Sequence, residues 1–129
     1  MLENNERDFC ITIVIPYLIE KGHKIVNINS SRSVGNVKSF GWIRPDIVSI
    51  HEGITYITEV KVGRQQKRDA RALQAVIGQL IIHQFVQQEQ KHYGVVYQAV
   101  LPAKQGFEYF LRQEFQKFLH EFEIEVLLL

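Results

Sequence analysis

The chain has 129 residues, 46% of them hydrophobic, and its formal net charge at pH 7 is +1. This length predicts one domain, residues 1–129, with a single core. The near-neutral charge excludes a general electrostatic attraction to nucleic acid, so any such binding must come from local basic patches. The only cysteine, Cys10, cannot form an intramolecular disulfide, and its apolar neighbours predict a buried thiol in a reducing compartment.

No apolar run approaches the ~20 residues that a membrane span needs. The first residues lack the basic start of a signal peptide. We therefore expect a cytoplasmic protein without a membrane partner.

The first segment, from about Asn5 to Lys21, has features of both a helix and a strand. Phe9 to Ile15 is rich in β-branched residues, which favour strands, but Pro16 argues against a central strand. Gly22 follows the segment and is typical of a helix end. We predict a helix that is distorted near Pro16 and, because it is apolar nearly all round, well buried.

Lys24 to Asn29 alternates as a first strand, and a loop rich in serine, glycine and asparagine follows, from Ser30 to Trp42. Two more strands, 44–50 and 54–61, are joined by the turn His51-Glu52-Gly53. These two strands are expected to pair as a hairpin.

The hairpin carries the strongest signal for chemistry. Side chains alternate across a strand, so Glu59 and Lys61 share one face, and the hairpin can place Asp46 beside Glu59. Carboxylates without thiols form a hard oxygen site suited to Mg²⁺ or Mn²⁺, and a nearby ammonium can position or deprotonate a water. The residues therefore indicate metal-assisted hydrolysis of a phosphodiester.

Helical periodicity extends from Lys67 to about Gln90, and a strand from Tyr93 to Val100 follows. A second amphipathic helix is expected at 105–122 and a last strand at 123–129. The predicted core face of the first helix consists of Leu73, Val76, Ile77, Leu80, Ile81 and Gln84. The predicted inward residues of the second are Phe107, Phe110, Leu111, Phe115 and Phe118. The order α-β-β-β-α-β-α-β predicts an α/β fold, a mixed sheet covered by helices.

Pro45-Asp46 followed by Glu59-Val60-Lys61 resembles the signature of the PD-(D/E)XK nuclease superfamily, which includes type II restriction enzymes and archaeal Holliday-junction resolvases. In many members a helix after the Glu-x-Lys strand presents a glutamine, often with an aromatic residue four positions on. Gln79 matches, while His83 replaces the aromatic residue. The stretch from Glu59 to His83 looks most like the small element-excision controlling proteins and the stand-alone nuclease domains of this superfamily, which have a restriction-endonuclease-like fold.

The resemblance implies a role for each of these residues. Asp46, Glu59 and the carbonyl of Val60 would bind Mg²⁺, or Mn²⁺ as a substitute, and Glu6 would complete the shell directly or through water. Lys61 would orient the attacking water and stabilise charge in the transition state. Gln79 would hold Lys61 or the scissile phosphate. Glu3 competes with Glu6, since either acid could equally be one that the first turn of a helix favours.

A basic stripe follows the Glu-x-Lys strand at i, i+3, i+4 and i+7 spacing, and it consists of Arg64, Lys67, Arg68 and Arg71. A helix N-terminus favours anions, so the stripe could contact phosphate, although a solvated helix face explains it as well. Arg44 and Trp42 precede Asp46 and could also meet nucleic acid, while a core position is the alternative for Trp42. The five histidines show no paired zinc spacing, and most should lie at the surface or the core edge.

These patterns predict a magnesium-dependent endodeoxyribonuclease whose partners are DNA, a second copy of the chain and a protein that confers specificity. The first alternative is a catalytically silent or accessory nucleic-acid-binding protein of the same fold. The second is an α/β interaction module with no nucleic-acid function, in which the acidic hairpin is only a surface. The sequence does not distinguish DNA from RNA.

Overall fold

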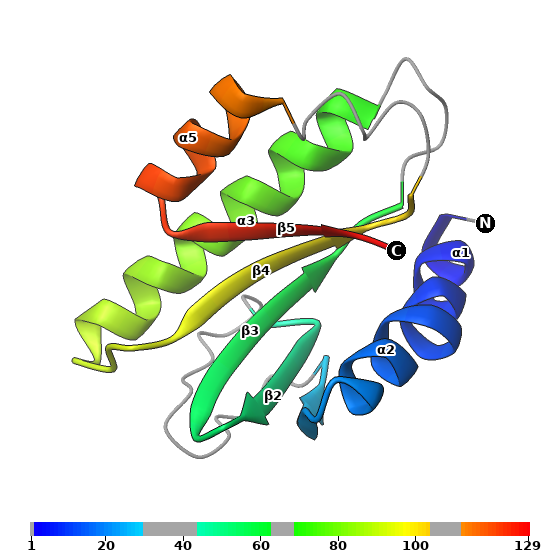
Figure 1. The fold of residues 1–129 in the computed structure, drawn as a ribbon, viewed down its shortest axis with the longest axis horizontal. Coiled ribbons are helices and arrows are strands. Elements are labelled where there is room, and N and C mark those ends of the chain that lie inside the picture. The colour runs from blue at the N-terminus through cyan, green and yellow to red at the C-terminus, as the bar shows by residue number, and fades with distance from the viewer. Residues whose placement is uncertain (1, 30–43, 63–68, 104–111) are drawn as a thin grey trace.

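The computed structural model describes residues 2–29, 44–62, 69–103 and 112–129 (Figure 1). The chain opens with α1 (Leu2–Phe9), a π-helical turn η1 (Cys10–Val14) and α2 (Ile15–Glu20), which together form one continuous helical segment. The elements that follow are β1 (Lys24–Ile28), β2 (Ile47–His51), β3 (Ile54–Val60), α3 (Asp69–Glu89), β4 (Val96–Leu101), α5 (Gln113–Glu121) and β5 (Ile124–Leu128). This order confirms the predicted α/β fold.

The five strands form one mixed sheet in the order β1-β2-β3-β4-β5. β2 is antiparallel to both β1 and β3, whereas β4 is parallel to both β3 and β5. β2 and β3 are joined by Glu52 and Gly53, whose φ angles of 51° and 77° suit the left-handed two-residue turn that matches strand twist. α3 provides the crossover that the parallel pairing of β3 and β4 requires.

Helices cover both faces of the sheet, with α1 and α2 on one side and α3 and α5 on the other (Figure 1). Each face has its own core, because neighbouring strand residues such as Ile47 and Val48 point to opposite sides. The core beneath the first helical segment consists of Cys10, Val14, Leu18, Ile47, Val60 and Val100. The core beneath α3 and α5 consists of Val48, Ile57, Leu73, Val76, Ile77, Leu80, Tyr97, Ala99, Leu101, Leu119 and Ile124.

The first segment is helical, as predicted, and its distortion lies at 10–14, just before Pro16. The prediction that this helix is well buried was wrong. Ile11, Ile13 and Ile19 are 50%, 44% and 56% exposed. The segment packs through one stripe against the sheet, so its other apolar side chains face outward.

Two inward-facing predictions for the later helices were also wrong, while most of the predicted face of α3 is buried as expected. Ile81 and Phe118 are 37% and 43% exposed. Phe118 instead packs its ring against Phe115 and Phe122, at centroid distances of 5.6 and 5.0 Å. Among the described residues no helix is long and apolar enough to cross a membrane. The predicted inward residues Phe107, Phe110 and Leu111 lie outside the described residues.

Candidate metal centre

Asp46 and Glu59 come together through the register of the hairpin. Ile47 of β2 pairs with Thr58 of β3, and extending this antiparallel register by one residue places Asp46 opposite Glu59. The two carboxyl groups share a side-chain hydrogen bond. The hairpin thus joins the two acids as the alternation of side chains predicts.

Asp46 is also fixed by backbone contacts on both sides. Its carbonyl accepts a hydrogen bond from the Asn29 N–H at 2.8 Å, just beyond the end of β1. Its Oδ2 accepts one from the Val60 N–H at 2.9 Å. Because the N–H and C=O of one strand residue point to the same edge, the Val60 carbonyl also faces the Asp46 side of β3.

Burial makes this pair of acids reluctant to ionise. The pKa of Asp46 is raised by burial first and then by the neighbouring charge of Glu59. The pKa of Glu59 is raised as well, again mainly by burial, with Glu6 adding to the rise. Two carboxyl groups in hydrogen-bond contact need a shared proton, and a divalent cation can replace that proton.

His83 on α3 holds the other side of Glu59. Its Nε2 lies 2.6 Å from Glu59 Oε1, and the residue is only 2% exposed. Burial lowers the pKa of His83 to about 4, so the ring is neutral near pH 7 and its Nε2–H donates to the carboxylate. The contact is therefore a hydrogen bond from a neutral donor to Glu59 rather than an ion pair, even though the two atoms are close enough for an ion pair.

The role of His83 was missed by the sequence analysis, which placed it one helical turn after Gln79 but assigned it no contact. Its burial makes it an exception to the expectation that most of the histidines lie at the surface or the core edge. The signal available in the sequence was the spacing of four residues, which puts both side chains on one side of the helix.

Lys61 and Glu6 meet at the rim of the pair. Lys61 Nζ lies 3.8 Å from Glu6 Oε1, and both side chains are about one quarter exposed, at 27% and 25%. The Lys61 backbone N–H donates to the Val100 carbonyl at 3.1 Å, which continues the pairing of β3 with β4. The structure thus brings α1 and the end of β3 together at one point.

Gln79 has a buried side-chain oxygen, Oε1, without a hydrogen-bond partner among the described residues. A buried polar atom left unpaired costs about 1–3 kcal/mol, so such an atom usually has a partner that completes it. Gln79 lies one turn before His83 on α3, the helix that reaches Glu59. An ammonium, a water or a bound ligand would satisfy it.

The predicted basic residues are only partly described. Arg44 and Arg71 are exposed, the latter in the first turn of α3. Arg64, Lys67, Arg68 and the nearby Trp42 lie outside the described residues. The stripe as a whole therefore stays a prediction.

The acids present suit a hard cation that keeps much of its water. Mg²⁺ is commonly bound through one or two carboxylates, which Asp46 and Glu59 offer together with the Val60 carbonyl. Within the described ranges, no group of three or more histidine, cysteine, aspartate and glutamate side chains forms a ready-made metal cage. The donor set fits Mg²⁺ or Mn²⁺ and does not resemble a structural zinc site.

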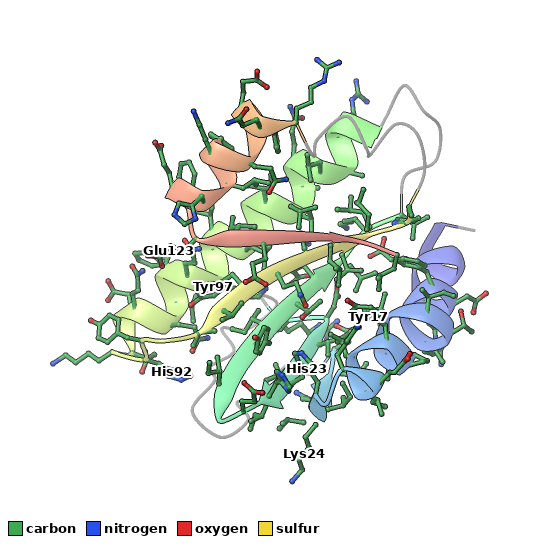
Figure 2. All side chains as sticks on the ribbon, in the orientation of Figure 1. Tyr17, His23, Lys24, His92, Tyr97 and Glu123 are labelled. Atoms are coloured by element: carbon green, nitrogen blue, oxygen red, sulfur yellow. The ribbon has the colours of Figure 1, made fainter. Side chains whose placement is uncertain are left out.

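A second polar cluster lies at the hairpin end of the same strands. Figure 2 shows His23 at that end, and its Nδ1 lies 2.9 Å from Ser49 Oγ. His23 stacks on His51 at a centroid distance of 4.7 Å and meets Tyr56 edge-on. These partly buried histidines agree with the core-edge prediction and contribute no ligand to the acid pair.

The fold is shared with two solved structures. One is an XisH family protein from Nostoc punctiforme, with 18% identity, a TM-score of 0.66, and coverage of 91% of this chain and 87% of that one. The other is a FdxN element excision controlling factor protein from Anabaena variabilis, with 17% identity, a TM-score of 0.69, and coverage of 94% and 89%. At this level of identity the likeness shows the shared α/β fold, a five-stranded mixed sheet covered by helices. No protein-family model and no curated protein matches the sequence.

Proposed function

We propose that the protein is a metal-dependent endodeoxyribonuclease of the PD-(D/E)XK type, which hydrolyses phosphodiester bonds in DNA. The observation that carries this proposal is the Asp46–Glu59 pair at the paired ends of β2 and β3, in which Glu59 is buried and Asp46 partly buried, with Lys61 just past the end of β3. Such a pair is unfavourable by itself at neutral pH and becomes favourable when a divalent cation is bound.

Each side chain has a distinct part in this mechanism. Asp46, Glu59 and the Val60 carbonyl would hold Mg²⁺, with Glu6 at the rim. When bound, the cation would supply Lewis-acid polarisation of the scissile phosphate and acidify a water. The Lys61 ammonium orients the attacking water and stabilises the negative charge that develops on the phosphate oxygens.

The remaining polar groups keep the reacting groups in place. Glu6 forms an ion pair with the Lys61 ammonium and so restricts the orientation of the Lys61 side chain. His83 fixes the orientation of Glu59 through its Nε2–H. The unpaired oxygen of Gln79 is suited to accept a hydrogen bond from Lys61 or from a water on the phosphate.

Nicking of supercoiled plasmid tests the proposal. The wild-type protein should cut in Mg²⁺ or Mn²⁺ and not in EDTA. Lys61→Ala should lower the cutting rate by about 100-fold or more, because it removes a charge that acts in the transition state. Lys117→Ala, an exposed change on α5, is the matched control and should cut at the wild-type rate. Cutting that survives Lys61→Ala or EDTA would contradict the mechanism.

A second function, nucleic-acid binding without cutting, is favoured by the fold shared with an excision controlling factor. Such an accessory protein would bind DNA in Mn²⁺ yet leave plasmid intact. An interaction module without a metal site is separated from both by Mn²⁺ titration, since it would bind Mn²⁺ no better than Asp46→Ala.

For the nuclease, we further propose a homodimer on duplex DNA, because one site per chain cuts two strands most simply under twofold symmetry. A protein partner would add sequence specificity, which a domain of this size must otherwise draw from DNA shape.

A further inference from the structure

The first helical segment meets the sheet through residues spaced by four. Cys10, Val14 and Leu18 are 9%, 0% and 1% exposed, and Glu6, four residues earlier, reaches Lys61. In a regular α-helix each step of four overshoots a full turn by about 40°, so Glu6 would lie about 120° away from Leu18. A stripe built only from steps of four does not stay on one face of such a helix.

The π-helical turn η1 (Cys10–Val14) corrects this rotation. Its closing hydrogen bond runs from the Ile15 N–H to the Cys10 carbonyl, five residues back instead of four. The turn therefore contains one extra residue, which offsets about 100° of the rotation between Glu6 and Leu18. Glu6 and Leu18 are then within about 20° of each other, the angle they would have if the helix were regular and one residue shorter.

Two side chains favour the wide turn at this place. Pro16 has no N–H, and its ring conflicts with the carbonyl four residues back, which belongs to Thr12. The Thr12 hydroxyl donates to the Asp8 carbonyl at 2.6 Å, a contact that bends helices. Thr12 itself is exposed, so its side chain adds nothing to the core.

We propose that the π-helical turn sets the rotation of α1 so that Glu6 stays on the metal-facing side of the helix. Thr12 and Pro16 act as positioning residues, because they favour the π-helical turn at this place. The inference rests on the proposed function, because it assigns Glu6 to the metal centre. It concerns Glu6, which lies 3.8 Å from Lys61, while the side chain of Glu3 lies outside the described residues. A regular helix of the same length would turn Glu6 away from Lys61 while Val14 and Leu18 stayed in the core.

Deletions give a test with opposite expected outcomes. Removing Thr12, together with Pro16→Ala, produces a regular helix in which Glu6 keeps its direction. Mn²⁺ affinity, measured by calorimetry, should stay within about threefold of wild type, and adding Glu6→Gln should weaken it by about tenfold, as in the full-length chain. Removing both Thr12 and Ile13, again with Pro16→Ala, turns Glu6 away by about 100°. Mn²⁺ affinity should then fall by about tenfold, and Glu6→Gln should change nothing further.

The reactivity of the buried Cys10 thiol measures the rotation of the helix in the absence of metal. Cys10 should stay unreactive toward a disulfide reagent after the single deletion and react at least about tenfold faster after the double deletion. If the double deletion does not fold, one alanine inserted after Thr12 gives a similar rotation and the same expected results. Loss of the Glu6→Gln effect in the single deletion, or its persistence in the double deletion or the insertion, overturns the proposal.

Failure of the proposed function has a different signature. If Asp46→Asn leaves Mn²⁺ affinity unchanged, the metal centre itself is wrong, and the role of Glu6 falls with it. If Asp46→Asn weakens Mn²⁺ binding while Glu6→Gln in the full-length chain does not, only the present inference is overturned.

Discussion

The side chain of Glu59 is fixed from two sides in the candidate centre. Its carboxyl group shares a hydrogen bond with Asp46 and accepts another from His83. The strand pattern predicts the contact with Asp46, since alternation and hairpin register are both visible in the sequence. The contact with His83 joins residues 24 apart in the chain and depends on where α3 crosses the sheet. No local pattern determines that crossing, so the sequence indicates the acids and not the group that orients one of them.

Replacing His83 should separate orientation from packing. His83→Leu fills the buried position with an apolar side chain and removes the Nε2–H donor. It should weaken Mn²⁺ affinity by about tenfold or more, as loss of a hydrogen-bond partner behind a metal ligand does. His83→Gln restores an N–H donor and should stay within about threefold of wild type. Calorimetric titration with Mn²⁺ measures both. Equal affinities for the two variants would contradict an orienting role.

The acid pair should make the metal-free protein less stable as the pH rises. The pKa of Asp46 is raised to about 8 and that of Glu59 to about 7, mainly by burial, so the folded state binds protons that the unfolded state has released. The stability from these groups is complete below about pH 4 and is lost as the pH rises through 7 and 8. In EDTA the free energy of unfolding should fall by up to about 1.4 kcal/mol per pH unit for each such proton.

Urea unfolding between pH 5 and pH 9 measures this slope. Asp46→Asn should flatten it and stabilise the metal-free protein at pH 8, because the amide carries no charge to bury. Mg²⁺ at pH 8 should raise the stability of the wild type and have little effect on Asp46→Asn. Glu52→Gln, on the exposed turn, is the control and should keep the wild-type slope. A slope that Asp46→Asn does not alter would place the proton uptake elsewhere.

At the scale of elements, the sequence predicts which segments are helices and strands better than which of their residues are buried. The strands follow from β-branched alternation and from a turn that needs positive φ at Glu52 and Gly53. The helix periodicity is equally clear, but the width of a buried face depends on how many neighbours cover it. This is why Ile81 and Phe118 are exposed although their spacing fits the core side.

Neighbouring positions on α3 give a matched test of that difference. Leu80 is fully buried in the core under α3, whereas Ile81 is 37% exposed. Leu80→Ala should lower the free energy of unfolding by about 2–5 kcal/mol, because it leaves a cavity. Ile81→Ala should lower it by less than about 1 kcal/mol, since much of its surface already meets water. Similar losses for both variants, measured by urea unfolding, would mean that Ile81 is covered in solution.

For the whole molecule, topology and charge lead to a single expectation about DNA. The order of elements sufficed to predict the mixed sheet, because a hairpin followed by a helical crossover permits few arrangements. The net charge of +1 means that attraction to DNA must come from a few local contacts rather than from the field of the whole protein. Those contacts depend on individual arginines, and their positions relative to the acids do not follow from periodicity.

Arg71 is a described residue that tests such a contact. It is exposed in the first turn of α3, where a helix N-terminus also favours phosphate. Each phosphate contact releases counterions, so Arg71→Ala should weaken binding to all DNA sequences alike and reduce the slope of log K against log salt by about one. Isotherms at several salt concentrations, in Ca²⁺ to prevent cutting, measure this slope. Lys117→Ala removes the same charge from α5 and should leave the slope unchanged. An equal reduction of the slope in both variants would indicate diffuse attraction. An unchanged slope for Arg71→Ala would make this residue part of an ordinary solvated face.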